Sequence, residues 1–162
     1  MFAETGNLLQ TLALAGGARR ILEVGTGDGH ATLAMATTLA ADGMMITMEI
    51  DAPRAGRARE RLAAAGYGDR VSVMVGDATR FLHKIAGPFD LIFQDSDPAH
   101  YDQMLDRLCD LLRPGGVLVT GGIVSDGNPQ MAFNLRLSTD LRFHTSFLQV
   151  SSGVAISVKR AS

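Results

Sequence analysis

Short runs of hydrophobic residues alternate with segments of helical periodicity along this chain. A continuous apolar run is typical of a strand that helices cover on both faces, because neither face then needs polar side chains. The pattern predicts strands at Arg20–Val24, Met44–Glu49, Val71–Val75, Phe89–Gln94 and Val117–Thr120. Strands that alternate with helices in this way indicate an α/β protein built on a largely parallel sheet.

The intervals between these strands have helical patterns. They predict helices at about Ala31–Ala41, Pro53–Ala65, Ala78–Ile85 and Pro98–Leu112. Asp51 and Asp97 are suited to cap the second and the fourth of these helices, since a proline follows each of them near the first helical position. The Pro114-Gly115-Gly116 segment should end the last of these helices before the fifth strand.

The last part of the chain has a different pattern. A helix at about Gln130–Asp140 precedes two predicted strands, Phe143–Val150 and Val154–Lys159. The link between these strands is of hairpin length, so the last strand should run antiparallel to its neighbour. The predicted fold is a single α/β domain over residues 1–162, a Rossmann-like three-layer sandwich with a seven-stranded, mostly parallel sheet and an antiparallel last strand.

Composition and charge narrow the functional classes. The chain has 162 residues, with 15 Lys+Arg against 17 Asp+Glu and a formal net charge of −2. A charge so close to zero, without a block of like charges, argues against a surface for nucleic acid or an anionic membrane. The single cysteine excludes an internal disulfide. The apolar stretch Leu8–Gly17 has no basic leader and is interrupted by Gln10 and Thr11, so we expect no signal peptide, no membrane span and a cytoplasmic protein.

A glycine-rich motif follows the first strand, in the sequence Glu23-Val24-Gly25-Thr26-Gly27-Asp28-Gly29. Glycines at a strand-to-helix turn let the backbone approach a ligand closely. A dinucleotide fingerprint would require a glycine at position 30, where this chain has His30, so the spacing favours a nucleoside without a pyrophosphate. Taken alone, the motif is equally compatible with a tight turn before a helix.

Two carboxylates strengthen the nucleoside interpretation. Glu49 ends the second strand, where an acidic side chain can accept both hydroxyls of a ribose. Asp77 follows the third strand and can accept a hydrogen bond from an adenine amino group, although it is also placed to cap the next helix. The carboxyl ends of adjacent parallel strands meet at one edge of the sheet, so these groups should face the same crevice.

With these motifs the chain resembles the class I S-adenosylmethionine-dependent methyltransferases, and among them the O-methyltransferases of the catechol and caffeoyl-CoA type. The resemblance covers nearly the whole chain. It is carried, in family order, by Glu4-Thr5-Gly6, Ile21-Leu22-Glu23-Val24-Gly25-Thr26-Gly27, Thr47-Met48-Glu49-Ile50-Asp51, Val75-Gly76-Asp77-Ala78, Phe89-Asp90-Leu91-Ile92-Phe93 and Leu112-Arg113-Pro114-Gly115-Gly116.

The resemblance also implies which residues hold S-adenosylmethionine, the methyl donor. Glu23 with Gly25, Thr26, Gly27 and Gly29 would hold its methionine part, Glu49 and Ile50 its ribose, and Gly76, Asp77 and Ala78 its adenine, with Asp95 also placed against the donor.

The acceptor side departs from the family pattern. In that family an aspartate after the fourth strand and an Asp-Asn pair after the fifth bind a divalent cation that engages the acceptor hydroxyls. Asp95 matches the first position, but Gly121 and Gly122 occupy the other two and offer only backbone carbonyls, a poor set for Mg²⁺. Pro98 stands where the family has a lysine that assists deprotonation. We therefore expect no metal site and a reaction that does not require Mg²⁺.

Methyl transfer to a hydroxyl requires in-line alignment and removal of the hydroxyl proton. Near the fourth-strand loop, the candidate groups are Asp95, Asp97, His100 and Tyr101. We hypothesise that His100 is the general base, together with Asp95 as a catalytic residue, because an imidazole titrates near neutral pH. The alternative is that His100 is an exposed residue of the predicted helix and takes no part.

Four arginines, Arg54, Arg57, Arg59 and Arg61, suggest a basic patch on the predicted helix over residues 53–65. Glu60 interrupts them, so a solvated helix face is the preferred interpretation.

The predicted function is therefore S-adenosylmethionine-dependent methyl transfer to a hydroxyl of a small molecule, without a divalent cation. The alternative is a catalytically weak S-adenosylmethionine-binding protein that acts through a partner, whereas His30 disfavours a nicotinamide dehydrogenase. Relatives usually form their acceptor site with a helical segment before the equivalent of Glu4-Thr5-Gly6, which here is almost at the start. We expect an acceptor cleft that is open, or one that a second subunit completes in a homodimer.

Overall fold

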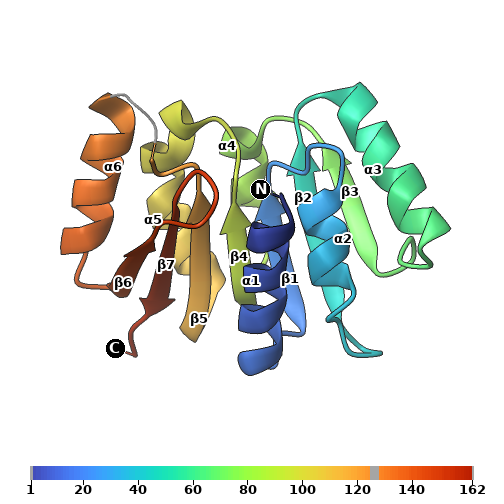
Figure 1. Cartoon of the computed structure of the whole chain (residues 1–162), viewed down its shortest axis with the longest axis horizontal. Helices are drawn as coiled ribbons and strands as arrows, with labels where there is room; N and C mark the ends of the chain where they lie inside the picture. Colours follow the sequence, from blue (N-terminus) through green and yellow to red (C-terminus); the bar gives the residue numbers. More distant parts are fainter. Residues whose placement is uncertain (1, 125–127, 162) are drawn as a thin grey trace.

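A seven-stranded sheet forms the centre of the computed structural model, which describes residues 2–124 and 128–161 (Figure 1). Its strand order is β3-β2-β1-β4-β5-β7-β6. The strands are β1 (Arg20–Val24), β2 (Met44–Glu49), β3 (Val71–Val75), β4 (Phe89–Gln94), β5 (Leu112–Gly121), β6 (Phe143–Leu148) and β7 (Val154–Lys159). The bounds of β1 to β4 and of β7 are those predicted from the hydrophobic pattern.

Helices cover the sheet on both faces, which confirms the predicted three-layer arrangement. One face carries α1 (Phe2–Ala15), α2 (His30–Ala36) and α3 (Ala52–Ala64), and the other carries α4 (Ala78–Phe81) with the 3₁₀ turn η1 (Leu82–Lys84), α5 (Tyr101–Leu111) and α6 (Asn128–Thr139). Two separate apolar clusters, one between each helical layer and the sheet, form the core. Burial on both faces explains the continuous apolar character of the strands.

The sheet is mostly parallel, as predicted. Strands β1 to β5 pair in parallel, whereas β7 runs antiparallel to both β5 and β6. The last strand in the chain thus lies between its two neighbours, and β6 forms the outer edge. β6 ends at Leu148, two residues before its predicted end.

β5 is longer than the predicted strand. It begins at Leu112 instead of Val117, so the Pro114-Gly115-Gly116 segment lies inside the strand rather than before it. The register explains this, because Phe89 pairs with Leu112 whereas Leu91 already pairs with Val117. β5 therefore bulges away from β4 between these two pairs, and a bulge accommodates proline and glycine.

Three predicted helices are shorter or divided. α2 ends at Ala36, where the hydroxyls of Thr37 and Thr38 bond back to carbonyls of the preceding turn. The predicted helix over residues 78–85 is split into α4 and η1. The segment predicted as one helix from Pro98 is a 3₁₀ turn, η2 (Pro98–His100), followed by α5 from Tyr101.

One helix, α1, is not predicted from the sequence. Its Leu9 and Ala13 lie one turn apart and are buried against the sheet. Gln10 Nε2 donates a hydrogen bond of 3.2 Å to the Ala34 carbonyl on α2. The stretch before Arg20 has no N-cap signal, so only its packing against the sheet and α2 identifies it as a helix.

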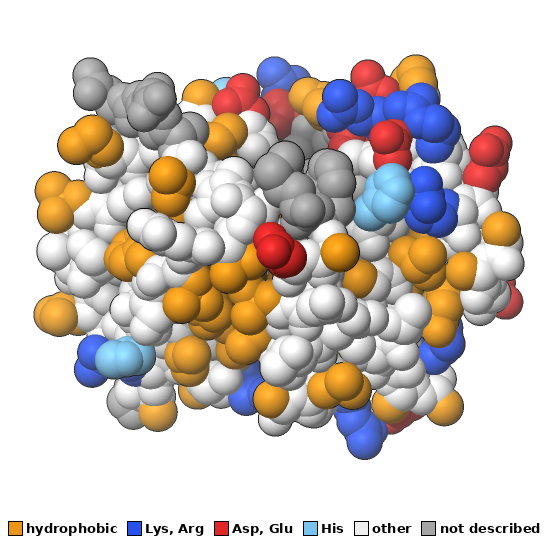
Figure 2. Space-filling view, in the orientation of Figure 1, with side chains coloured by type: hydrophobic (Ala, Val, Ile, Leu, Met, Phe, Trp, Pro, Cys, Tyr) orange, Lys and Arg blue, Asp and Glu red, His pale blue; other side chains and the backbone are white. Residues whose placement is uncertain are grey.

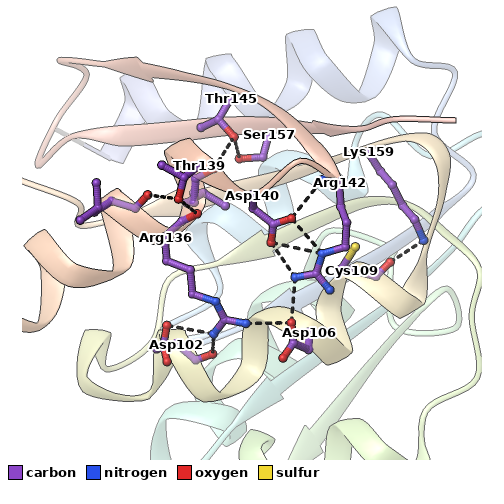
Figure 3. A network of polar contacts seen from close by, with 12 residues as sticks. Asp102, Asp106, Cys109, Arg136, Thr139, Asp140, Arg142, Thr145, Ser157 and Lys159 are labelled. Atoms are coloured by element: carbon purple, nitrogen blue, oxygen red, sulfur yellow. Dashed lines mark hydrogen bonds and ion pairs between the residues drawn. The ribbon is translucent and has the colours of Figure 1, made fainter. Parts of the chain in front are cut away.

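A network of ion pairs joins α5, α6 and the segment that follows α6 (Figure 3). Arg136 contacts Asp102 and Asp106 on α5 at 2.9 and 2.8 Å. Arg142 contacts Asp106 and Asp140 at 2.7 and 2.6 Å. Hydrogen bonds from Arg142 and Arg136 lower the pKa of Asp106. The network fixes α6 to α5 through charged groups.

Part of the sheet lacks a helical cover on the α1 side among the residues that the structure describes. Val117 and Ile156 are half-buried there, and Leu148 and Val158 are each 37% exposed. Figure 2 shows hydrophobic side chains gathered on this face. No helix in the described part of the chain is long and apolar enough to cross a membrane.

Candidate active site

A cavity of about 690 Å³ lies at the carboxyl ends of β1 to β4. Most of the predicted site residues line it, namely Gly25, Thr26, Gly27, Glu49, Ile50, Gly76, Asp77, Ala78, Asp95 and His100. Two predicted donor-binding residues, Glu23 and Gly29, lie outside this lining. The structure thus brings the ends of four strands together at one crevice, where open α/β sheets bind ligands.

The glycine turn is in contact with the β4 end. A Cβ atom on Gly25 would lie 2.3 Å from the carbonyl oxygen of Asp95, and Gly25 has a φ of +98°. Both the close approach and the backbone conformation require glycine at this position. The turn therefore shares one wall of the cavity with the acceptor-side loop.

Helix α3 supports the turn from outside the cavity. Arg57 Nε lies 2.8 Å from Asp28 Oδ1, and Arg61 Nε donates a hydrogen bond of 2.9 Å to the Asp28 carbonyl. The hydrogen bond from Arg57 lowers the pKa of Asp28. All four arginines are exposed, as expected for a solvated helix face, but Arg57 and Arg61 also bond to the glycine turn. Their spacing of four residues places them on one side of the helix.

Glu23 lies behind the turn, fully buried. Its Oε2 atom accepts hydrogen bonds from Thr32 and Thr47, at 2.5 and 2.6 Å. Thr47 in turn contacts the hydroxyl of Thr26 at 2.6 Å, so a chain of hydroxyls connects Glu23 to the glycine turn. Burial raises the pKa of Glu23 to about 8. Its predicted contact with the donor stays a prediction, while the structure places it as a support for Thr26.

Glu49 joins the ends of β1 and β2. Its two carboxylate oxygens accept hydrogen bonds from Gly27 N at 2.7 Å and Asp51 N at 3.0 Å. Only 6% of Glu49 is exposed, and the exposed part faces the cavity. These two bonds fix the carboxylate at the position where ribose hydroxyls can donate to it.

Asp77 is placed both to cap the next helix and to face a ligand in the cavity, the two roles that the sequence allows. Its side chain caps α4 by accepting bonds from Thr79 N at 2.9 Å and Thr79 Oγ1 at 2.7 Å. These bonds lower the pKa of Asp77. Because Asp77 also lines the cavity, capping holds its carboxylate in place beside Ala78.

The acceptor end of the cavity is formed by the loop after β4. Asp95, Ser96, Asp97, His100 and Met104 line it. Asp95 opens toward the cavity, but the protein atoms around it raise the pKa of its carboxyl group by desolvation. Asp97 caps η2 through a bond of 3.0 Å from Ala99 N, so its carboxylate is already used by the backbone.

His100 lies at the end of η2, exposed on the cavity wall. Its Nδ1 atom is 2.8 Å from the Gln103 side-chain amide. If the Gln103 amide nitrogen donates to Nδ1, the neutral ring carries its proton on Nε2. If the amide is reversed, its oxygen accepts from Nδ1–H, and Nε2 is then the free acceptor. The orientation of Gln103 therefore decides which ring nitrogen can take a proton.

The fourth candidate, Tyr101, is not placed to act as a base. It is 1% exposed, and its hydroxyl donates toward the carbonyls of Ser96 and Gly121, at 3.2 and 3.1 Å. Burial raises the pKa of Tyr101 far above its ordinary value. Tyr101 thus connects the loop after β4 to the end of β5.

The acceptor end lacks two of the three side chains with which the family pattern binds a divalent cation. The described residues contain no group of three or more His, Cys, Asp or Glu side chains that could hold a metal ion. Gly121 and Gly122 supply no side chains, and the Gly121 carbonyl already accepts from Tyr101. Asp95 and Asp97 are the carboxylates at this end, and Asp97 Oδ1 already accepts from Ala99 N, so oxygen ligands from side chains are few for Mg²⁺.

The chain is similar to known proteins over most of its length. The chain matches the family model described as O-methyltransferase over residues 1–160. It is 36% identical over 126 residues to a catechol O-methyltransferase from Niastella koreensis and 38% identical over 126 residues to one from Mycobacterium tuberculosis. These alignments cover 75% and 77% of this chain, respectively, and the chain spans 57% of the length of each relative.

A solved structure is similar to nearly the whole fold. The O-methyltransferase from Bacillus cereus, crystallised in complex with SAH (S-adenosylhomocysteine), superimposes with a TM-score of 0.89 at 29% sequence identity. The match covers 96% of this chain and 80% of that one.

Proposed function

Because the chain belongs to the O-methyltransferase family, we propose that its cavity binds S-adenosylmethionine and that the acceptor end directs the methyl group to a hydroxyl of a small molecule. The observation that carries this proposal is the convergence of the glycine turn, Glu49 and Asp77 on one cavity. Each is a modest signal alone, but together they provide acceptors for a ribose and an adenine beside a backbone turn that admits a ligand closely.

The residues divide the cavity into a half for the nucleoside and a half for the methionine part of the donor. Glu49 and Ile50 hold the ribose, and Gly76, Asp77 and Ala78 surround the adenine, at the ends of β2 and β3. The turn from Gly25 to Gly29, supported by Glu23 through Thr26, holds the methionine part. This order places the sulfonium near Asp95, whose carboxylate complements a positive charge.

S-adenosylmethionine, when bound, supplies an electrophilic methyl carbon attached to a sulfonium. Asp95 accepts a hydrogen bond from the acceptor hydroxyl and orients its oxygen in line with the carbon–sulfur bond. His100 takes the hydroxyl proton at Nε2, with its Nδ1–H donating to the Gln103 side-chain oxygen. The oxygen–carbon bond forms as the carbon–sulfur bond breaks, with the electron pair passing to sulfur. The products are the methyl ether, S-adenosylhomocysteine and a protonated imidazole.

Titration calorimetry with S-adenosylmethionine tests the binding half of the proposal. We expect binding in the micromolar range, weakened at least tenfold by Glu49→Ala, because that variant removes the ribose acceptor. Glu60→Ala, an exposed change on α3, is the matched control. Absence of binding at high micromolar donor would contradict the proposal.

An acceptor screen that measures S-adenosylhomocysteine tests the catalytic half. Catechol is the first acceptor to use, since two of the relatives are named for it. Donor binding without turnover of any hydroxyl compound would favour the second candidate function, a catalytically weak binding protein. The replacement of two ligand positions by Gly121 and Gly122 is the observation on which that candidate rests.

We further propose that turnover does not need a divalent cation, because Gly121 and Gly122 stand where the family pattern has two of its cation ligands. Activity after treatment with EDTA is expected to equal that of the untreated protein. A loss in EDTA that Mg²⁺ restores would overturn this prediction. The expected homodimer and cytoplasmic location stay predictions; sedimentation equilibrium measures the first and cell fractionation the second.

A further inference from the structure

Two glycines lie against Asp95, one beside its backbone and one beside its carboxylate, while the side chain stays open toward the cavity. A Cβ atom on Gly121 would lie 2.6 Å from Asp95 Oδ1 and 3.1 Å from its Cγ atom. On the other side, a Cβ atom on Gly25 would meet the Asp95 backbone. The carboxylate thus occupies the space that any side chain at position 121 would need.

Tyr101 connects the two strand ends that carry this contact. Its hydroxyl lies 3.2 Å from the carbonyl of Ser96, the residue after Asp95, and 3.1 Å from the carbonyl of Gly121. The ring packs edge-on against Phe133 of α6, with 5.4 Å between ring centroids. The ring is buried, and the hydroxyl therefore holds the loop after β4 and the end of β5 at a fixed separation.

We propose that Gly121 and Tyr101 are positioning residues for the acceptor end of the cavity. Gly121 leaves the space in which the Asp95 carboxylate lies, and Tyr101 sets the distance between the backbones that bear the two residues. The inference rests on the proposed function, in which Asp95 contacts the acceptor. The inference gives Gly121 a positioning role at the site where the family pattern has a second carboxylate.

A purely structural role would predict something different. Gly121 pairs with Val154 in the sheet, and alanine is normally at least as favourable as glycine in a paired strand. If the Asp95 contact did not matter, Gly121→Ala should therefore be neutral or stabilising. If the contact matters, the added methyl group must displace the carboxylate.

The test combines Gly121→Ala with Asp95→Ala. In the otherwise native chain, Gly121→Ala is expected to raise the midpoint of urea unfolding less than it does in the Asp95→Ala background, because the exposed carboxylate turns away at a small cost. It is also expected to reduce kcat with catechol by roughly 10²-fold. Asp95→Ala should reduce kcat by a similar factor. In the Asp95→Ala background, Gly121→Ala should have no further effect on kcat, and the midpoint should show the full gain of an alanine in a paired strand, since no carboxylate remains to be displaced.

Gly122→Ala is the matched control. Gly122 has a φ of +67°, so alanine is strained there, but its Cβ atom would meet only the Tyr101 hydroxyl, at 4.0 Å. Its effect on the unfolding midpoint should be the same with and without the Asp95 side chain. Tyr101→Phe, which keeps the ring and removes the hydroxyl, should lower kcat about tenfold with little change in KM for S-adenosylmethionine.

Two results would overturn the inference, and they are distinguishable. If Asp95→Ala lowers kcat while Gly121→Ala leaves kcat unchanged and shifts the unfolding midpoint equally in both backgrounds, Asp95 is catalytic but Gly121 does not position it. If Asp95→Ala itself keeps full turnover, the proposed role of Asp95 fails and the inference fails with it. The unfolding measurements need no acceptor, so the contact is decided even if catechol is not methylated.

Discussion

Glu23 is a carboxylic acid kept away from water. Two threonine hydroxyls donate to the same oxygen, but burial outweighs them and raises the pKa of Glu23 to about 8. At neutral pH the side chain is therefore mainly protonated in the folded protein, whereas in the unfolded chain it is ionised. Folding binds a proton at this residue.

This proton uptake makes stability depend on pH. Because the folded pKa lies above the unfolded value of 4.5, the stabilisation is fully present below pH 4.5 and is lost progressively as the pH rises toward 8. The slope from this residue is roughly 1.4 kcal/mol per pH unit in that window. Glu23→Gln, which cannot ionise and keeps an acceptor for Thr32 and Thr47, should flatten the curve measured by urea unfolding. Glu60→Gln, at the surface, should leave it unchanged.

His100 is the residue on which the proton transfer depends. His100→Gln should lower kcat by roughly 10²-fold on the true acceptor while the dissociation constant of S-adenosylmethionine stays the same, because the imidazole acts only on the acceptor proton. Steady-state kinetics with calorimetry measures both quantities. Replacing the exposed His144 on β6 with Gln provides the control. Unchanged turnover in His100→Gln would leave His100 as an exposed residue at the end of η2.

At the scale of elements, α3 and the glycine turn act as one unit. Arg57 and Arg61 bond to Asp28, and a Cβ atom on Gly29 would already lie 3.0 Å from that of Ala58, so the helix and the turn are in direct contact. Both arginines are exposed, and each interaction should therefore be worth less than about 1 kcal/mol.

Arg57→Ala and Arg61→Ala should accordingly each raise the dissociation constant of S-adenosylmethionine by about threefold, since a less rigid turn holds the methionine part less well. Titration calorimetry at low ionic strength measures the change. Arg59→Ala is the matched control, because Arg59 lies on the same helix but donates to the Val73 carbonyl on β3. An equal effect of all three variants would show that only the charge of the helix matters.

The elements differ in how far the sequence predicts them. β1, β2 and β4 are largely buried on both faces, so their apolar runs reveal their bounds directly, and the apolar run of the outer strand β3 does so although β3 is only partly buried. α1 is defined by contacts with α2 and the sheet, which no local pattern contains. The division at His100 follows from Asp97 and Pro98, which favour a capped turn, so the cap is predicted correctly while the helix that it starts is not.

The candidate site divides in the same way. Glu49 and Asp77 could be placed from the sequence because each directly follows a recognisable strand. Thr47 and Arg57 could not, since they contact the turn or its support from elements distant in the sequence, and Thr32 could not because its bond to the buried Glu23 carboxyl leaves no local pattern. Gly121 was visible as a departure from a family pattern, but its contact with the Asp95 carboxylate exists only in three dimensions.

At the scale of the whole molecule, the last strand ties the layers together. β7 is paired on both sides, and Lys159 at its end donates to the carbonyls of Cys109 and Leu112, at 2.7 and 2.8 Å. These carbonyls belong to the last turn of α5 and the residue after it, where a cation is favourable.

Lys159→Met should therefore destabilise the protein by about 1–3 kcal/mol, because two charge-assisted hydrogen bonds are lost from a partly buried position. The expected fall in the melting temperature is about 3–10 °C. The other lysine of the chain, Lys84, is exposed, and Lys84→Met serves as the control. Equal melting temperatures for the two variants would contradict the role of Lys159.

The position of β7 also determines when the sheet can be completed during synthesis of the chain. β6 is synthesised before β7, yet all of its pairs in the sheet are with β7. While the ribosome is still working, α6 and β6 therefore have no strand that joins them to the sheet, and β5 presents an open edge. Open edges invite pairing with other chains. A chain halted before Val154 would carry an unpaired edge on β5 and a β6 without any partner strand, so the synthesis of β7 both joins β6 to the sheet and closes the edge of β5.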